Sequence, residues 1–352
     1  MRNILITGIG GPTPRSIAKT LRKIDPQYKI TGIDSNPKAI GFHLPDLIDH
    51  QYVVPGAKDA TYWDRIMEII KTRQIDLAFI QPEVEVIAWG KYFEKHNRYP
   101  VKTLIPPTAL SASLMDKAIM AELLEDTPFI PRTIKISQDD PRLEEIGDKI
   151  GYPCWIRATK GSGGYGSLKI ENESNLQSWL FIHKTIAEFT VSEFLPGRHL
   201  ANQMLYYEGE YIKGASLECV EYVMASVAPS RVTGNTSYGR FINEDAILDF
   251  SHSCITHIAD KLHIKPHGVL SFDLKEDRNG ALKVTEVNIR HMAYTGIMAE
   301  VGFDLVYDTL QILESGITSV KNEPHYQFKE DYAFLRDVDV EPIIVNDHRL
   351  QK

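Results

Sequence analysis

The strongest constraint on the fold is the alternation of short apolar strands with helical segments in the first 110 residues. The expected strands cover residues 4–6, 28–33, 51–54, 77–80 and 103–105, and a helix is expected over residues 63–71. Strands that alternate with helices form parallel sheets, because each connection has to cross back over the sheet. We therefore expect residues 1–110 to form a doubly wound parallel-sheet domain.

The rest of the chain has the pattern of antiparallel sheet with fewer helices, so the fold class is α/β together with α+β. Pro106 and Pro107 mark the first boundary, and Ser113 followed by Asp116 has capping-box spacing, which predicts a helix start. Strands are expected over residues 152–157, 167–171, 191–194, 200–227, 269–274, 282–289, 332–335 and 342–345, and helices over 246–262 and 305–313. We expect domain limits at 1–110, 111–190, 191–325 and 326–352.

The composition is that of an ordinary water-soluble protein, and 352 residues are enough for two or three domains. The net charge of −8 provides no basic field for nucleic acid or an anionic membrane. No apolar run approaches the roughly 20 residues that span a bilayer. Cys154, Cys219 and Cys254 are widely separated and are interpreted as reduced thiols. With no signal segment before the first strand, we expect a cytoplasmic protein.

A first glycine cluster lies at residues 8–11, after the first strand, and Asp34 ends the second strand, as in a dinucleotide-binding fingerprint. The third glycine of that fingerprint would fall at Thr13, so the pattern is incomplete. We interpret the glycines as a tight strand-to-helix turn or part of a substrate mouth, with Thr13 as N-cap and Pro14 as the first helical residue. NAD binding stays open as an alternative.

A second glycine cluster, residues 161–166, has four glycines in six positions and cannot form the interior of a strand or helix. Its backbone N–H groups could wrap a polyphosphate, with Arg157 and Lys160 supplying positive charge. No G-K-[ST] sequence follows, so the segment is not a Walker P-loop. A plain flexible hairpin tip fits this segment alone equally well.

A hairpin with charged and polar residues is expected around Asn279 and Gly280, a strong two-residue turn signal. With that turn, counting back along both strands places Asp273 directly opposite Glu286. Residues that face each other across two strands have Cβ atoms about 4.5–5.5 Å apart. A four-residue turn would shift this register, so the pairing is a prediction.

Two carboxylates this close repel each other unless a cation lies between them. Glu286, Asn288 and Arg290 alternate along the second strand and so share one face. Asp273, Glu286 and Asn288 then form a hard-oxygen set suited to Mg²⁺ shared with phosphates. Arg290, next to such a metal, requires an anion between the two cations, either a transferring phosphoryl group or an oxyanion. A solvated hairpin with ordinary surface charges is the alternative.

The order of these motifs resembles the ATP-grasp superfamily, in particular the ligases related to the carbamoyl phosphate synthetase large subunit. The resemblance extends from the first domain to about residue 315. It implies a pre-ATP-grasp domain over 1–110 that no longer binds a dinucleotide. It also implies a first ATP-grasp lobe with a glycine-rich flap over 111–190, a second lobe with the metal site over 191–325, and a C-terminal strand and tail.

The resemblance also implies roles for individual residues. The ATP contacts it implies are Lys117, Arg157, Lys160, Gly161, Ser162, Gly163, Gly164, Gly166, Glu193, Phe194, Leu195 and His199; the metal ligands are Asp273, Glu286 and Asn288; and the catalytic residue is Arg290. His199 stands where many relatives carry a ribose-binding glutamate, and simple packing at the turn is the other interpretation.

The chemistry implied is that of an ATP-dependent carboxylate–amine ligase that proceeds through an acyl phosphate, with two Mg²⁺ ions, or Mn²⁺ in their place. The partners implied are a small carboxylate and an amine, and a homodimer is compatible with the pattern. Candidate substrate contacts are Arg231, Arg240, His291 and Tyr294, and Glu83 and Glu85 could attract an amine. Three rival functions stay open: carboxyphosphate or carbamoyl phosphate synthesis, non-catalytic nucleotide binding, and an NAD-dependent oxidoreductase.

Overall fold

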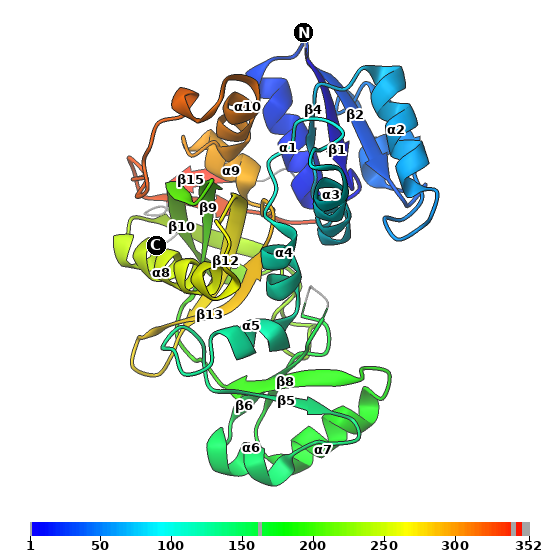
Figure 1. Cartoon of the computed structure of the whole chain (residues 1–352). Helices are drawn as coiled ribbons and strands as arrows, with labels where there is room; N and C mark the ends of the chain where they lie inside the picture. The colour runs from blue at the N-terminus through cyan, green and yellow to red at the C-terminus, as the bar shows by residue number, and fades with distance from the viewer. Residues whose placement is uncertain (1, 161–163, 339–342, 347–352) are drawn as a thin grey trace.

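The computed structural model describes residues 2–160, 164–338 and 343–346. Its strands form one parallel sheet and two antiparallel sheets, arranged along the length of the molecule (Figure 1). The parallel sheet lies at the N-terminal end, the large antiparallel sheet in the middle, and the small antiparallel sheet at the opposite end (Figure 1). No helix in the described ranges combines the length and the apolar composition that a bilayer crossing requires.

The parallel sheet is built from the first four strands in the order β3-β2-β1-β4. Its elements are β1 (Asn3–Thr7), α1 (Pro12–Ile24), β2 (Lys29–Asp34), a 3-10 turn (Ile40–Phe42), β3 (His50–Val53), α2 (Tyr62–Arg73), β4 (Leu77–Phe79) and α3 (Glu83–His96). The parallel pairing confirms the expected sheet. Two local predictions are wrong: Gly11, not Thr13, is the N-cap of α1, and residues 103–105 form no strand, because only Lys102 bridges to Leu77.

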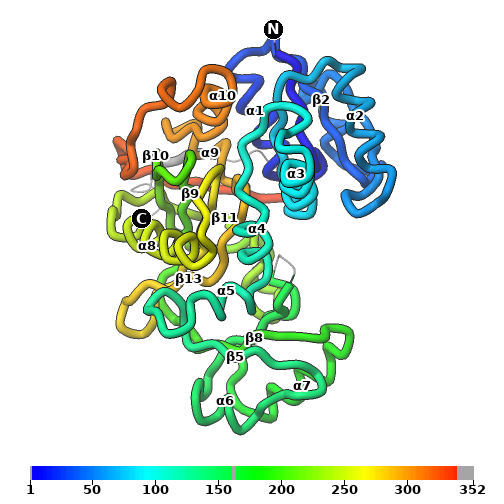
Figure 2. The backbone as a smooth tube through the Cα atoms, in the orientation of Figure 1, coloured from blue at the N-terminus to red at the C-terminus, as the bar shows by residue number. Residues whose placement is uncertain are grey.

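Two short helices, α4 (Thr108–Met115) and α5 (Lys117–Leu123), lead from the parallel sheet to the small sheet (Figure 2). Ser113 lies inside α4 and begins no helix, so the predicted capping box is wrong. Asp116 instead caps α5, because its side chain accepts a hydrogen bond from the Ala118 N–H at 3.0 Å. This cap fixes the start of α5, and with it the position of Lys117.

The small sheet is antiparallel, with the order β5-β8-β6-β7, and two helices cover one of its faces (Figure 1). Its elements are β5 (Thr133–Ser137), α6 (Leu143–Lys149), β6 (Cys154–Ala158), β7 (Leu168–Ile170), α7 (Glu173–Ile182) and β8 (Glu188–Glu193). Alternate residues of β6 are buried in one separate hydrophobic cluster, which includes Ile156, Ile170 and Phe189. The intervening residues, Trp155 and Arg157, therefore point to the opposite face.

The large antiparallel sheet has the order β13-β12-β9-β10-β11-β14-β15. Its elements are β9 (His199–Tyr207), β10 (Glu210–Tyr222), β11 (Thr236–Ile242), α8 (Asp245–Leu262), β12 (Gly268–Glu276), β13 (Leu282–Asn288), α9 (Thr295–Glu300), α10 (Leu305–Ser315), a 3-10 turn (Ile317–Ser319), β14 (Tyr332–Leu335) and β15 (Ile343–Asn346). Sequence reasoning missed β5, β11, α3, α4, α6, α7 and α9. It also merged β9 and β10 into one run.

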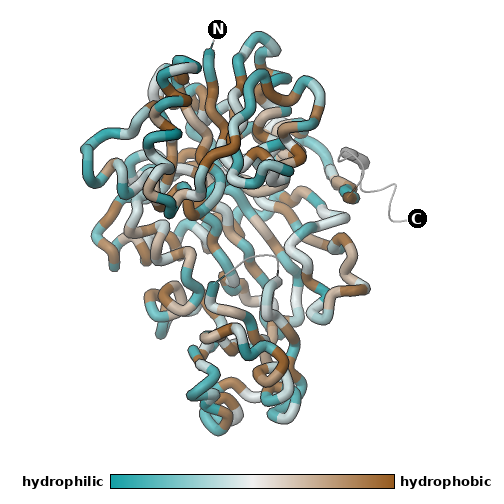
Figure 3. The backbone as a smooth tube through the Cα atoms, turned by 90° about the vertical axis from the view of Figure 1, so that its right-hand side faces the viewer, coloured by the Kyte–Doolittle hydropathy of each residue, from teal (hydrophilic) through white to brown (hydrophobic). Residues whose placement is uncertain are grey.

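The parallel sheet and the large sheet share their hydrophobic cores. One cluster joins Leu5 and Trp89 of the N-terminal part to Leu270 of β12, and another joins Ile4 and Ile6 to residues of α10. Figure 3 shows hydrophobic segments running through the interior of the N-terminal part and into the large sheet. The carboxyl ends of the parallel strands are consequently held against the β12–β13 hairpin, where the candidate site lies.

Candidate active site

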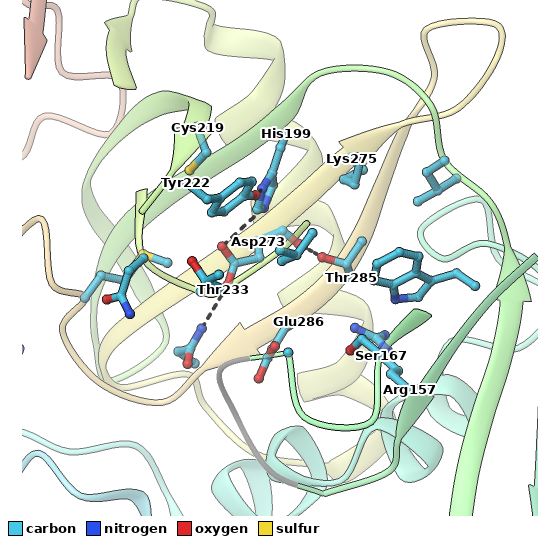
Figure 4. A pocket seen from close by; sticks show the side chains of 18 of the residues that line it. Arg157, Ser167, His199, Cys219, Tyr222, Thr233, Asp273, Lys275, Thr285 and Glu286 are labelled. Carbon is cyan, nitrogen blue, oxygen red and sulfur yellow. Dashed lines mark hydrogen bonds and ion pairs between the residues drawn. The ribbon is translucent and has the colours of Figure 1, made fainter. Parts of the chain in front are cut away.

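A cavity of about 620 Å³ opens between the small sheet and the large sheet (Figure 4). Its lining comes from three parts of the chain: β6 and the segment after β8 on one side, β10 and the β12–β13 hairpin on the other, and the first turn of α1 at one end. Of the residues predicted to act, the cavity is lined by Lys117, Arg157, Gly164, Glu193, Phe194, Leu195, His199, Asp273, Glu286, Asn288, Arg290 and Tyr294.

The β12–β13 hairpin carries the acidic end of the cavity. Asp273 pairs with Glu286, as the sequence predicts. The pairing arises in a different way from the one predicted, however. The turn is longer than two residues, because the Asp277 N–H donates to the Ala281 carbonyl. A β-bulge at Thr285 then brings Asp273 opposite Glu286 again. The Thr285 hydroxyl donates to the Asp273 carbonyl at 3.0 Å and so secures the bulge.

Asp273, Glu286 and Asn288 offer a donor set that fits Mg²⁺. The Asn288 side-chain amide nitrogen donates to Asp273 Oδ2 at 3.2 Å, so the amide and the carboxylate are adjacent. A half-turn of the amide brings its oxygen to the same place, which would give two carboxylates and one carbonyl oxygen around one point. Among the described residues, no group of three or more His, Cys, Asp or Glu side chains is arranged for a metal, so this mixed set is the candidate.

Two cations approach this acidic face from the other side of the cavity. The Lys117 ammonium lies 3.3 Å from Glu286 Oε1, and its side chain is only 8% exposed. Arg157 is half-buried, and its Nε is fully buried with no hydrogen-bond partner among the described residues. Burial lowers the pKa of Arg157, while Glu286 and Asp273 oppose that shift. A guanidinium with a buried, unsatisfied N–H favours binding of an anion.

The segment after β8 forms the far end of the cavity. Both carboxylate oxygens of Glu193 are taken by Arg132, one by its backbone N–H and one by its guanidinium. The Gly197 N–H bonds to the Glu276 carbonyl at 3.0 Å, and this close approach excludes a side chain at position 197. These contacts hold the backbone of residues 193–197 along the cavity edge, where backbone groups are expected to contact the nucleotide base.

His199 links two lining residues. Its Nδ1 hydrogen-bonds the Tyr222 hydroxyl, and its Nε2 lies 3.6 Å from Asp273 Oδ1 (Figure 4). The imidazole therefore orients an expected metal ligand, a contact that sequence reasoning did not predict. The predicted contact with a ribose stays a prediction.

The glycine-rich flap is described only in part. Gly161, Ser162 and Gly163 lie outside the described residues. Gly164 has a φ of +76° and lies so close to the Val232 carbonyl that an added Cβ would be 2.7 Å from its oxygen. The Lys160 ammonium is 3.1 Å from Asp116 Oδ2 and is not among the residues that line the cavity.

Arg290 lies at the end of the cavity nearest the parallel sheet. Its Nη2 is 3.4 Å from Glu83 Oε1, and its Nη1 donates to the His291 carbonyl at 3.1 Å. His291 itself does not line the cavity; burial, with a contribution from Arg290, lowers its pKa to about 3, so it is neutral at neutral pH. The Tyr294 hydroxyl, by contrast, bonds to Thr236 at 2.6 Å beside the cavity.

The two candidate arginines of the loop and strand after β10 do not line the cavity. Arg240 lies on β11, 3.9 Å from Glu218, which does line it. Arg231 has a φ of +56° in the loop between β10 and β11. Their predicted contacts with a substrate stay predictions.

The first glycine cluster forms a turn that is closed by its own neighbours. Asp34 accepts hydrogen bonds from the N–H groups of Gly10 and Asn36, one on each oxygen. The segment containing Gly41 packs so tightly on this turn that an added Cβ would lie 2.2 Å from the Ile9 carbonyl oxygen. Asp34 thus stabilises the loop, and this arrangement favours the tight-turn interpretation over NAD binding.

Several lining residues were not predicted: Pro12, Thr13, Trp155, Cys219, Tyr222 and Lys275. The signal for Lys275 was present, because it follows Asp273 by two positions on one strand and so shares its face. Trp155 likewise precedes Arg157 by two positions on β6. Thr13 and Tyr222 come from segments whose approach to the hairpin depends on tertiary packing, which leaves no local pattern.

Known proteins resemble this chain at two levels. The family model for the ATP-binding domain of the carbamoyl-phosphate synthase L chain matches residues 116–318. A formate-dependent phosphoribosylglycinamide formyltransferase from Polaromonas naphthalenivorans (strain CJ2) is 33% identical over 127 residues. That match covers 34% of this chain and 30% of the relative, so it spans well under two thirds of either protein.

Solved structures match nearly the whole fold at low sequence identity. The N5-carboxyaminoimidazole synthetase from Staphylococcus aureus, complexed with ADP, has a TM-score of 0.71 and 15% identity, with 95% of this chain and 82% of that chain covered. An L-amino acid ligase from Bacillus licheniformis has a TM-score of 0.68 and 14% identity, with coverages of 95% and 79%.

These likenesses confirm the expected fold, in which an N-terminal parallel sheet precedes two lobes of antiparallel sheet. The family match begins at Asp116, which caps α5, and runs past the β12–β13 hairpin, so it includes both walls of the cavity. Since the matched residues make up more than half of the sequence, the chain belongs to the family of the carbamoyl-phosphate synthase L chain ATP-binding domain.

Proposed function

We propose that the protein is an ATP-dependent ligase that activates a carboxylate as an acyl phosphate and transfers the acyl group to an amine. The observation that carries the proposal is the meeting of opposite charges in one cavity. Lys117 and Arg157 reach in from one lobe, and Asp273, Glu286 and Asn288 face them from the other. A polyphosphate with its metal would satisfy both sets at once.

The cations are proposed to hold the phosphates of ATP. Arg157 has a buried N–H with no partner in the described structure, and Lys117 is fixed by its position at the start of α5. Both groups have lost most of their contact with water, so their attraction for phosphate oxygens is stronger than at an exposed site. The base would lie along residues 193–197, at the opposite end of the cavity from Arg290.

Mg²⁺ held by Asp273, Glu286 and Asn288 would neutralise the charge that develops on the phosphates. Without a cation, Asp273 and Glu286 repel each other across the hairpin, and Lys117 offsets only one of them. His199 and Thr285 fix Asp273 by its side chain and its carbonyl, respectively, so the donor set is already oriented. Such second contacts to metal ligands raise both affinity and geometric precision.

The proposed reaction has two steps. A carboxylate oxygen of the substrate attacks the γ-phosphorus of ATP, the bond to the ADP oxygen breaks, and an acyl phosphate forms. An amine nitrogen then attacks the acyl carbon, inorganic phosphate leaves, and the nitrogen loses a proton to water. Arg290 stabilises the oxyanion of the tetrahedral intermediate. The residues that line the cavity act chiefly by positioning and charge, which is how phosphoryl transfer is usually catalysed.

A substrate site next to Arg290 is proposed from the residues at that end. Thr13, Met292 and Tyr294 line it, and the Tyr294 hydroxyl is already bonded to Thr236. Among the described lining residues at this end, Arg290 is the cation best placed for a carboxylate. The named activities of the similar proteins, an L-amino acid ligase and a formate-dependent formyltransferase, support a small carboxylate as substrate.

The test is a substrate screen with the purified protein and Mg-ATP. Pools of amino acids, uronic acids and small carboxylates are combined with amines, and ADP and phosphate release are measured. Amine-dependent release with formation of an amide product is expected. Release that depends on bicarbonate alone would instead assign carboxyphosphate chemistry. A protein that binds ATP without turnover in any pool would be a nucleotide-binding protein, and the ligase proposal would fail.

A further inference from the structure

The N-terminal parallel sheet touches the catalytic end of the cavity at one charged contact. Glu83 is the first residue of α3, and its Oε1 lies 3.4 Å from Arg290 Nη2. The two residues are 207 positions apart in the sequence. The Arg290 side chain is 24% exposed and the Glu83 side chain 30%, so the pair is partly shielded from water.

Glu83 lies in the first turn of α3, at the amino end of the helix. The positive end of the helix dipole favours a negative charge there. Glu85 lies two residues further on, and burial raises its pKa to about 7. Of the two acids in this turn, Glu83 is the one that forms an ion pair with Arg290.

Arg290 is held at both terminal nitrogens. Nη2 faces Glu83, and Nη1 donates to the carbonyl of His291. A guanidinium is planar and presents five N–H donors in a fixed arrangement, so two anchored nitrogens fix the direction of the others. The remaining N–H groups then have one orientation with respect to the cavity.

The segment that follows Arg290 is also attached to the N-terminal part. The Gly296 N–H donates to Ser16 Oγ on α1 at 2.9 Å, and the His291 ring packs against Phe79 of β4 at 6.2 Å between centroids. An added Cβ on Gly296 would lie 2.3 Å from Ser16 Oγ, so the two segments are in direct contact. Three separate contacts thus tie residues 290–296 to the parallel sheet and its helices.

We propose that Glu83 is a positioning residue, through which the N-terminal part aims the Arg290 guanidinium at the reacting carbonyl. This inference rests on the proposed function, because it assigns Arg290 to the oxyanion. It differs from a direct role in which Glu83 attracts the amine substrate. The two roles make different predictions for a pair of substitutions, since a positioning residue acts only through its partner.

The experiment is a double-mutant cycle with Glu83→Ala, Arg290→Ala and the double variant, using the substrates that the screen identifies. Glu83→Ala is expected to lower kcat by about 10- to 100-fold, the size typical of a misplaced catalytic group. It should leave the KM for ATP within about twofold. In the Arg290→Ala background it should have no further effect. Glu83→Gln, which keeps an oxygen at the same place, should restore part of the loss.

Glu94→Gln is the matched control, since Glu94 is an exposed acid on the same helix, and it should behave like the wild type. The proposal would be overturned in favour of direct amine binding by either of two results. One is a loss of kcat in the double variant equal to the product of the losses in Glu83→Ala and Arg290→Ala, and the other is a change in Glu83→Ala that is confined to the KM of the amine. A wild type without turnover would refute the proposed function instead, and a second measurement then still tests the positioning role.

The second measurement needs no turnover. Phenylglyoxal modifies arginine side chains, and mass spectrometry of the digested protein gives the rate at Arg290. Release from Glu83 should make the Arg290 guanidinium more mobile and more reactive, so Glu83→Ala should raise the rate several-fold over wild type and over Glu94→Gln. An unchanged rate at Arg290 would overturn the proposed contact whatever the enzyme's substrates are.

Discussion

Glu286 is the single residue on which the proposed chemistry depends most, because it faces Asp273 and lies against Lys117. We predict that Glu286→Gln leaves the fold intact and abolishes measurable Mg-ATP turnover. The rate should fall by about 10²-fold or more, which is the loss typical of removing a group that stabilises charge in the transition state. Steady-state ADP release and a thermal unfolding curve provide the two measurements. Wild-type activity in this variant would show that the metal site has been assigned to the wrong residues.

Glu85 makes the stability of the protein sensitive to pH. Burial raises its pKa to about 7, and hydrogen bonds from Thr7 and Tyr62 only partly oppose this. The unfolded state ionises near the ordinary value of 4.5, so the native state binds more protons between pH 4.5 and 7. The stability that the neutral carboxyl provides is therefore complete below pH 4.5 and declines as the pH rises to 7.

Glu85→Gln removes this ionisation, so the variant should match the wild type at pH 4.5 and exceed its stability at pH 8. The expected gain is on the order of 3–4 kcal/mol, at about 1.4 kcal/mol for each pKa unit between 4.5 and about 7. Urea unfolding at both pH values measures it. A difference between variant and wild type that is the same at the two pH values would contradict the assigned pKa.

How far single residues could be predicted depended on whether their role is local. Asp273, Glu286 and Asn288 could be placed on one face because strand alternation and a nearby turn determine it. Glu83 could be singled out as an acid after a strand of the parallel sheet, but its partner Arg290 follows a strand of the large antiparallel sheet. No pattern in one sequence encodes a contact across 207 positions.

At the scale of elements, the segment between β8 and β9 depends on a close backbone approach. A Cβ on Gly197 would lie 2.5 Å from Glu276 Cβ and 2.8 Å from the Glu276 carbonyl oxygen. Gly197→Ala should therefore displace the segment that is proposed to hold the base. We predict a decrease of at least about tenfold in affinity for ATP, measured by calorimetric titration, since 1.4 kcal/mol corresponds to one factor of ten.

Gly147→Ala is the matched control, because Gly147 lies in α6 and a Cβ there would meet nothing within 4 Å. It should leave ATP affinity unchanged and slightly stabilise the helix. Equal affinities for the Gly197→Ala variant and the wild type would mean that residues 193–197 do not form the base site.

The accuracy of the predicted elements followed the strength of the local pattern. Strands with clear apolar runs, such as β1, β2 and β12, and the amphipathic helix α8 agree with the sequence-based limits. β11 was missed because Gly239 and polar residues interrupt its pattern, although an added Cβ at Gly239 would collide with Phe334 of β14. The predicted length of the β12–β13 turn was wrong, but the predicted pairing of Asp273 with Glu286 is correct, because the bulge at Thr285 offsets the difference in turn length.

At the scale of the whole molecule, α10 connects the parallel sheet to the large sheet through a buried ion pair. The Lys213 ammonium on β10 lies 2.8 Å from Asp308 Oδ2 on α10, and both side chains are about nine-tenths buried. Asp308→Asn would leave the Lys213 charge without its partner. We predict a loss of about 3–5 kcal/mol in the free energy of unfolding, measured by chemical denaturation.

Glu314→Gln tests the same helix at its surface, because Glu314 pairs with Arg2, whose side chain is half exposed. That ion pair faces water, and exposed pairs contribute little. The denaturation midpoint should stay close to that of the wild type. An effect of Asp308→Asn no larger than that of Glu314→Gln would show that the buried pair does not join the two sheets.

The cavity lies between the small sheet and the large sheet, which do not share a hydrophobic cluster. The small sheet has its own hydrophobic cluster, and two stretches of chain link it to the rest: α5 with its flanking segments, and residues 194–198 between β8 and β9. A ligand that contacts both Arg157 and Glu286 would connect the small sheet to the large sheet. In a calorimetric scan of the protein without nucleotide, the small lobe should therefore unfold at a lower temperature than the rest, which gives two peaks. Saturation with nucleotide should replace them with one peak at a higher temperature.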